Sequence, residues 1–154
     1  MTPMEVMDDA AAFLRKVVQE YDAKQVKGIY PIAVYAGYPP VRDKPVEKSS
    51  YIYVLATNIE DSDGEDLSTV KIEIGFSIYD NDGTNGWRSL YNLMEHVRQN
   101  LLKHRWLLSR RTALVLPLKG AVADAQPFPQ WEGQLEAVYS IGQPEEVGID
   151  YETF

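Results

Sequence analysis

Residues 68–80 read STVKIEIGFSIYD, and this stretch decides the fold. Large apolar side chains occupy every second position, and mostly polar ones lie between them. The apolar set is Val70, Ile72, Ile74, Phe76 and Ile78, and the opposite set is Lys71, Glu73, Ser77 and Tyr79. Because successive side chains of a strand point to opposite faces, the pattern predicts a strand with one buried face.

A second strand is predicted immediately before this one. Residues 51–59 read YIYVLATNI and are rich in β-branched and aromatic side chains, which favour strands. The residues between the two strands, 61–66, read DSDGED and form a short acidic turn. Two strands joined by a short polar turn containing glycine predict a β-hairpin.

The chain begins with the pattern of an amphipathic helix. Thr2, Pro3 and Glu5 fit the cap, the first helical position and the third position of a capping box. Apolar residues then recur at helical spacing, at Met7, Ala10, Ala11, Leu14, Val17, Val18 and Tyr21. We expect a helix of about five turns that ends before Gly28.

A second helix is predicted after the polar loop at residues 80–86. Asn85 fits the position of its cap. Its expected buried stripe consists of Trp87, Leu90, Met94, Val97 and Leu101. The helix is expected to end near His104.

Three further strands complete the expected elements, at residues 29–35, 112–118 and 131–141, with an irregular connection at 120–130. Pro31 places the first of these at a sheet edge or at a strand start. Because consecutive strands mostly lack helices between them, we expect an α+β fold with a mostly antiparallel or mixed sheet and both helices on one face. We expect residues 1–143 to form a single domain and residues 144–154 an acidic tail, either frayed or docked on a neighbour.

The charge of the chain is acidic overall but uneven. The net charge is −8, which disfavours general attraction to DNA or to anionic lipid. Residues 88–111 nevertheless hold six basic side chains and one acid, Glu95. There are no cysteines, so disulfides and thiolate metal sites are excluded. We also expect neither a signal peptide nor a membrane helix.

No residue pattern predicts catalysis or a cofactor. The acidic loop that starts at Asp80 has Asn85 and Tyr91 where a calcium loop needs glycine and glutamate, and the loop that starts at Asp61 fails in the same way. The two histidines are eight positions apart on one helix, too far apart to share a metal ion easily. We therefore expect no enzyme, no catalytic or metal-binding residues and no cofactor.

The order of these elements resembles a known family. An N-terminal amphipathic helix leads into Ile29-Tyr30-Pro31, then a long alternating strand and a glycine-containing turn at residues 70–86, and a helix follows at once. That helix carries the pattern Trp87-x-x-Leu90-x-x-Leu93-Met94-x-x-Val97-x-x-x-Leu101. Over roughly residues 4–141 this layout resembles the tail terminator proteins of long-tailed bacteriophages and phage-tail-like particles.

The resemblance implies a homohexameric ring on the head-proximal end of a tail tube. Such a ring stops tube polymerisation and offers a surface for joining the head. Its implied partners are its own copies, the tube protein, and possible sheath and head–tail connector proteins, with DNA only passing through. The implied location is a virion or tail-like particle assembled in the host bacterial cytoplasm. The family carries no catalytic residues.

A ring needs two different complementary surfaces on each subunit, and charge suggests candidates for them. The hypothesis pairs a basic helix face with an acidic turn, and adds a docking loop at residues 39–50. The basic face is Arg88, Arg98, Lys103 and Arg105, the acidic turn is Asp61, Asp63, Glu65 and Asp66, and the loop supplies Arg42 and Lys44. Exposed aromatics also favour interfaces, and Tyr38, Tyr51, Tyr53 and Tyr79 are candidates for the outer sheet face.

Three alternatives stay open at the level of sequence. The chain fits another phage structural role, such as a head–tail connector or a baseplate component. It also fits a monomeric accessory domain that binds a peptide or small ligand, which would show one closed apolar pocket. An enzyme would show a cleft with convergent titratable groups. A ring subunit would instead show two separated patches and extended arms.

Overall fold

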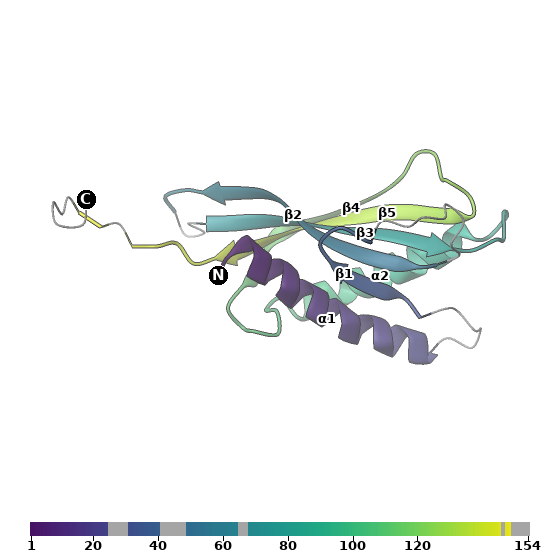
Figure 1. Cartoon of the computed structure of the whole chain (residues 1–154), viewed down its shortest axis with the longest axis horizontal. Coiled ribbons are helices and arrows are strands. Elements are labelled where there is room, and N and C mark those ends of the chain that lie inside the picture. The colour runs from purple at the N-terminus through teal and green to yellow at the C-terminus, as the bar shows by residue number, and fades with distance from the viewer. Residues whose placement is uncertain (25–30, 41–48, 65–67, 146, 149–154) are drawn as a thin grey trace.

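The computed structural model describes residues 1–24, 31–40, 49–64, 68–145 and 147–148. These residues form two helices and one five-stranded sheet. The elements are α1 (Pro3–Lys24), β1 (Ala33–Ala36), β2 (Tyr51–Asp61), β3 (Ser68–Tyr79), α2 (Trp87–Lys103), β4 (Ala113–Val122) and β5 (Gln130–Ile141). Both helices lie on the same side of the sheet (Figure 1). The predicted α+β class with a mixed sheet is confirmed.

The strands lie in the order β1-β2-β3-β5-β4. Only β1 and β2 run parallel, and the other neighbours are antiparallel. The predicted hairpin of β2 and β3 is present, with Asp61 opposite Ser68 and a register shift between Ala56 and Asn58. Strand β3 lies in the centre and pairs with β5 from Ser68 to Tyr79. This long pairing explains why the most regular stretch of the sequence forms the middle of the sheet.

The core lies between the helices and one face of the sheet. The five apolar residues predicted for β3 are all buried, and β5 adds Leu135, Ala137 and Tyr139. The opposite face of the sheet carries no helix among the described residues (Figure 1). Lys71, Glu73 and Tyr79 on that face are half-buried. The two-residue alternation of β3 therefore separates a dry face from a partly solvated one, as expected.

Helix α1 begins with the predicted capping box. The Thr2 N–H donates to Glu5 Oε1 at 3.2 Å, and the Glu5 N–H donates to Thr2 Oγ1 at 3.1 Å. These hydrogen bonds from Thr2, the backbone one first, hold the pKa of the Glu5 carboxyl below its usual value. The expected apolar stripe of α1 is buried or half-buried, and Val6 and Phe13 extend it.

The start of α2 differs from the prediction in two respects. The cap position belongs to Gly86, not Asn85, and no side chain caps the helix. Instead, Asp82 Oδ1 accepts hydrogen bonds from the N–H groups of Thr84 and Asn85, which organises the preceding loop. Trp87 was predicted to be buried, but it is 39% exposed, and its Nε1 donates to the Thr84 carbonyl of the preceding loop at 3.1 Å. The other predicted stripe residues of α2 are buried.

Two strand boundaries also differ. Strand β1 occupies Ala33–Ala36 and lies at the sheet edge that Pro31 predicts, while the predicted start at residues 29 and 30 lies outside the described residues. Strand β4 continues to Val122, four residues beyond the prediction. A register shift between Val115 and Lys119 lets the strand pass Pro117 and resume its pairing with β5. Pairing with β5 thus overrides the strand-breaking composition of this stretch.

The two histidines join α1 to α2. The ring of His96 makes a hydrogen bond through Nε2 with the Val17 carbonyl oxygen at 3.1 Å, and it packs against Tyr21 at 5.1 Å between ring centroids. His104 contacts the edge of Phe13 at 5.9 Å. Both side chains therefore belong to the contact between the helices, and they project from α2 at separate points along it.

Candidate functional site

The acidic turn lies at the free end of the β2–β3 hairpin. Asp61 and Asp63 are exposed there, and Asp61 accepts a hydrogen bond of 2.6 Å from Ser68 Oγ. Gln143, at the root of the chain segment that follows β5, donates to Ser68 Oγ at 3.1 Å. The predicted turn residues Glu65 and Asp66, and the predicted loop residues Arg42 and Lys44, lie outside the described residues.

The basic residues of α2 do not form one patch. Arg88 follows the first residue of the helix and Lys103 is the last, and a helix of 17 residues is about 25 Å long. The guanidinium of Arg88 lies 4.8 Å from the centre of the Trp87 ring, a cation–π contact. All four predicted basic residues, including Arg105, are exposed. The helix therefore carries its positive charges toward two separate ends.

Arg98 is already paired within the subunit. Its Nε and Nη2 donate to the two carboxylate oxygens of Glu95, each at 2.9 Å. The hydrogen bond from Arg98, and then the one from Gln99, hold the pKa of Glu95 below its usual value. A bidentate pair of this kind neutralises Arg98 locally. The hypothesis that Arg98 meets the acidic turn of a neighbour is therefore weaker than the same hypothesis for Lys103 or Arg105.

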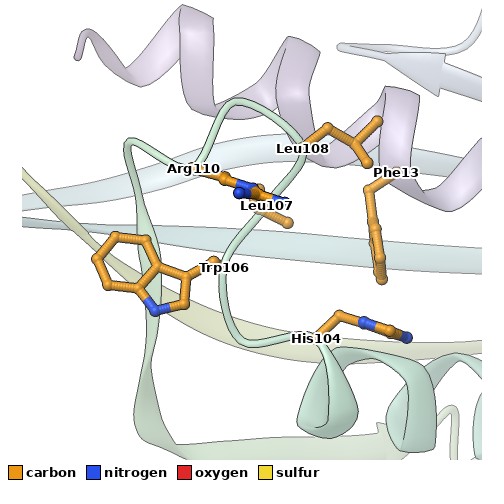
Figure 2. Close-up of a pocket in the computed structure, with 6 residues that line it drawn as sticks. All are labelled: Phe13, His104, Trp106, Leu107, Leu108 and Arg110. Atoms are coloured by element: carbon orange, nitrogen blue, oxygen red, sulfur yellow. The ribbon is translucent and has the colours of Figure 1, made fainter.

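An open groove lies at the C-terminal end of α2, where the chain turns toward β4. Its volume is about 590 Å³, and its lining residues are Phe13, His104, Trp106, Leu107, Leu108 and Arg110. Figure 2 shows Phe13 extending from α1 toward His104, with Trp106 pointing away from both. Trp106 is 59% exposed and Leu108 43% exposed, so the groove presents apolar surface to solvent.

Hydrogen bonds fix the loop that forms this groove. Leu114 N–H donates to the Arg105 carbonyl at 2.7 Å, and Leu107 N–H donates to the Thr112 carbonyl at 3.2 Å. Ser109 N–H donates to Asp9 Oδ1 of α1 at 3.1 Å. The loop is therefore attached both to the sheet and to α1. Exposed apolar side chains on a well-anchored loop are characteristic of binding surfaces.

A second aromatic surface lies at the opposite end of α2. It consists of Trp87, Tyr91 and Phe128, which are all exposed. Trp87 and Tyr91 meet edge to face, with 5.5 Å between ring centroids. Phe128 packs in the same manner on the buried Trp131, at 6.1 Å. We call this set the aromatic end. Sequence reasoning placed Trp87 in the core and did not single out the other two residues.

The helix-free face of the sheet carries the predicted tyrosines. Tyr51, Tyr53 and Tyr79 lie on it half-buried, whereas Tyr38 follows β1 in the loop and is almost fully exposed. The Tyr53 ring lies across Gly75 on the neighbouring strand. Burial first, and then the charges of nearby carboxylates such as Glu73, raise the pKa of Tyr53. An open face of half-buried tyrosines provides hydrogen bonds and flat apolar area for docking.

In the parts of the chain that the structure describes, no three histidine, aspartate or glutamate side chains converge on one point. The raised pKa of the buried Tyr139 follows from desolvation first and then from the charge of Asp9, and its hydroxyl has no hydrogen-bond partner among the described residues. Neither described helix is long and apolar enough to cross a membrane.

No protein-family model matches the chain, and no curated protein matches its sequence.

Proposed function

We propose that the chain is a non-catalytic structural subunit that assembles with its own copies into a ring, and that the ring is a phage-type tail terminator. The observation that carries the proposal is the pair of exposed apolar surfaces at opposite ends of α2. The groove around Trp106 and the aromatic end around Trp87 are about 25 Å apart along the helix. A closed ring is built from two different surfaces on each subunit.

The shape of the subunit supports the same assignment. The β2–β3 hairpin extends beyond α1, and the segment after β5 leads away from the body (Figure 1). The outer half of β2, residues 57–61, is exposed at every position. Two projecting elements of this kind are suited to contacts with neighbours above, below or beside the subunit. In a tail terminator these neighbours would be copies, the tube protein, and a sheath or connector.

The main competing function is a monomeric ligand-binding domain. Such a domain has a concave pocket that encloses most of its ligand. The groove at the end of α2 has a suitable volume, but two of its lining residues, Trp106 and Leu108, are largely exposed. An open surface of this kind suits a protein partner better than an enclosed small molecule. The groove therefore favours assembly.

The charge distribution is compatible with a ring through which DNA passes. The hairpin turn presents Asp61 and Asp63 to solvent, and like charges disfavour contacts with phosphate. A lumen lined by such turns would let DNA slide without binding. The acidic turns then have a role that does not require them to meet a basic neighbour.

Native mass spectrometry across a concentration series, with negative-stain imaging of the same samples, tests the proposal. We expect a six-membered ring with a central hole, formed alone or on addition of a purified tail tube. Replacing Trp87 and Tyr91 by serine should weaken the ring while leaving the circular dichroism spectrum unchanged, because both side chains are exposed. The matched control is Tyr38→Ser, on an exposed aromatic outside both surfaces. A chain that stays monomeric alone and with the tube would refute the proposal.

A further inference from the structure

The segment that follows β5 combines acidic and apolar residues. Residues 142–154 read GQPEEVGIDYETF and hold four acids, Glu145, Glu146, Asp150 and Glu152, and no basic residue. Apolar side chains recur among them at Val147, Ile149, Tyr151 and Phe154. We call this segment the arm. An arm with these two properties would be bound best by a surface that is both apolar and positively charged.

The described part of the arm leaves the subunit in a defined direction. Gln143 attaches its root to the hairpin through hydrogen bonds to Ser68 Oγ at 3.1 Å and to the Ser62 carbonyl at 3.4 Å. Beyond this point the described residues are exposed, with Val147 at 71%, and they lead away from the sheet and helices (Figure 1). Thirteen residues span up to about 43 Å when extended, which is enough to reach a neighbouring subunit.

The groove at the end of α2 has the complementary character. Arg110 lines it together with the exposed apolar side chains Trp106 and Leu108. Lys103 and Arg105, both exposed, lie on either side of the lining residue His104 in the chain. None of these three cations forms an ion pair with a carboxylate among the described residues. Two other charges beside the groove have partners within the subunit. Arg111 pairs with Glu5 at 3.2 Å, and Asp9 accepts hydrogen bonds from Ser109. The groove thus offers apolar area and unpaired positive charge together.

The free edge of β2 is an alternative docking site for the arm, but it is less suitable than the groove. Strand β1 pairs with β2 only from Tyr51 to Val54, so the outer edge of β2 beyond Val54 has no strand beside it among the described residues. An extended arm could add there as a further strand. That edge, however, ends in Glu60 and Asp61 and leads to Asp63, all exposed. An acidic arm would meet like charges there, whereas it meets cations at the groove.

We infer that the arm of one subunit docks in the groove of a second copy of the same chain, with its aromatic side chains on Trp106 and Leu108 and its acids beside Lys103, Arg105 and Arg110. The inference rests on the proposed ring and identifies one contact that closes it. Each subunit donates one arm and accepts one, which is the head-to-tail geometry that a ring requires. The arm–groove contact is one part of the interface between neighbouring subunits, the aromatic end contributes to the rest of that interface, and the open sheet face remains available for other partners.

Disulfide capture tests this contact directly, since the native chain has no cysteine to interfere. Chains carrying Gly148→Cys in the arm are mixed with longer, tagged chains carrying Leu108→Cys in the groove, and oxidised glutathione is added as the oxidant. Apart from the two neighbours of Gly148 in the chain, no described residue has an atom within 4 Å of a Cβ added there, so the substitution meets open space. The matched control is Ile59→Cys, an exposed apolar residue on the open edge of β2.

We expect the mixed disulfide to form with Leu108→Cys at least tenfold faster than with Ile59→Cys. Faster capture by Ile59→Cys would overturn the inference in favour of strand addition at β2. Capture only within single chains that carry both Gly148→Cys and Leu108→Cys would overturn it as well, because the arm would then fold back on its own groove. Capture at neither position would leave the groove to a different partner and would also overturn it.

A charge exchange provides an independent measurement. Lys103→Glu with Arg105→Glu, or Glu145→Lys with Asp150→Lys, should each raise the concentration for half-assembly about tenfold, and more at low salt than at high salt. The four substitutions together should restore assembly, because the pairs are re-formed with opposite signs. Failure of this rescue contradicts the arm–groove contact.

These results separate the inference from the proposed function. If the native chain forms rings, but the charge exchange leaves them unaffected and no disulfide is captured between Gly148→Cys and Leu108→Cys of different chains, the inference falls and the ring stands. If the native chain never forms a ring but Gly148→Cys and Leu108→Cys are still captured between chains, the contact stands and the terminator role falls. If the native chain forms no ring and no disulfide is captured between chains, both the proposed function and the arm–groove contact are overturned.

Discussion

The contact between Gly75 and Tyr53 yields the sharpest prediction about the fold. Gly75 lies in the centre of β3, directly opposite Tyr53 on β2. A Cβ added at Gly75 would lie 2.0 Å from Cζ and 2.3 Å from Cε1 of the Tyr53 ring. Carbon atoms pack at about 3.5–4.0 Å, so in Gly75→Ala the ring has to move by about 1.5–2 Å. Glycine at this position lets an aromatic ring from the next strand cover the backbone, an arrangement that stabilises glycine in sheets.

The sign of the effect depends on the tyrosine. In the native background we expect Gly75→Ala to lower the free energy of unfolding by about 1–3 kcal/mol, which is typical of overpacking. In a Tyr53→Ala background the clash is gone, and alanine is favoured over glycine within a strand by about 0.5–1 kcal/mol. The same substitution should then stabilise the protein. The coupling energy of the double-mutant cycle is therefore about 2 kcal/mol or more.

Urea denaturation of the four variants, followed by circular dichroism, measures this coupling. The free energy of unfolding falls by about 2 kcal/mol per molar urea. The shift in urea midpoint caused by Gly75→Ala should therefore differ by roughly 1 M between the native and the Tyr53→Ala background. Gly142→Ala is the control, because no atom lies within 4 Å of the added carbon. Equal destabilisation by Gly75→Ala in both backgrounds would mean that the alanine meets something other than the ring, and the reasoning would be wrong.

Three further predictions concern single contacts. Tyr139→Phe removes a buried hydroxyl that has no hydrogen-bond partner among the described residues. Urea denaturation should therefore show an unchanged free energy of unfolding or a gain of up to about 1 kcal/mol. A clear loss would reveal that the hydroxyl has a hydrogen-bond partner in solution. Thr2→Ala should raise the pKa of the Glu5 carboxyl, which NMR titration measures. Because this pKa is lower in the folded than in the unfolded protein, the hydrogen bonds of Glu5 stabilise the fold at neutral pH, and this contribution is lost as the pH falls through the folded-state pKa. The Tm of the variant should therefore lie below that of the native protein at neutral pH, and the difference should shrink in acid. Gly86→Ala places a carbon 2.5 Å from the Asp82 carbonyl oxygen and should lower the free energy of unfolding by about 1–3 kcal/mol. In the control, Gly83→Ala, the nearest atom to the added carbon is 3.8 Å away, and the free energy of unfolding should change by less than about 0.5 kcal/mol. Equal effects of the two substitutions would contradict the geometry.

Local patterns predicted the elements because each depends on residues close together in sequence. The capping box joins Thr2 and Glu5, which are only three positions apart in the chain, and it formed as predicted. The alternation along β3 likewise predicted the five buried apolar side chains, whereas Ser77, predicted on the opposite face, is buried as well and accepts a hydrogen bond from Gln130. The end of β4 was missed because its pairing with β5 continues beyond Pro117, and pairing between strands is not visible in either strand taken separately.

The sequence-based hypothesis for the interface and the surfaces found in the structure rest on different residues. Sequence reasoning selected charged residues, since charge can be counted, and it chose Arg98, which the fold pairs with Glu95. It overlooked the groove, although the run Trp106-Leu107-Leu108 lies outside any predicted element; Leu107 is buried, and Trp106 and Leu108 are exposed. Exposed apolar side chains next to basic residues are a second signal of an interface, independent of charge.

The sequence by itself determined the class of the fold, the central strand, the two amphipathic helices and the absence of thiol chemistry, because periodicity and composition act locally. Only the tertiary structure decided that Trp87 and Trp106 lie exposed at opposite ends of α2, that Leu108 opens into a groove, and that Tyr53 covers Gly75. These features depend on how a helix is rotated on the sheet and on which strands are neighbours. Both are fixed by the packing of the whole core, where each side chain is placed by contacts with residues distant in sequence.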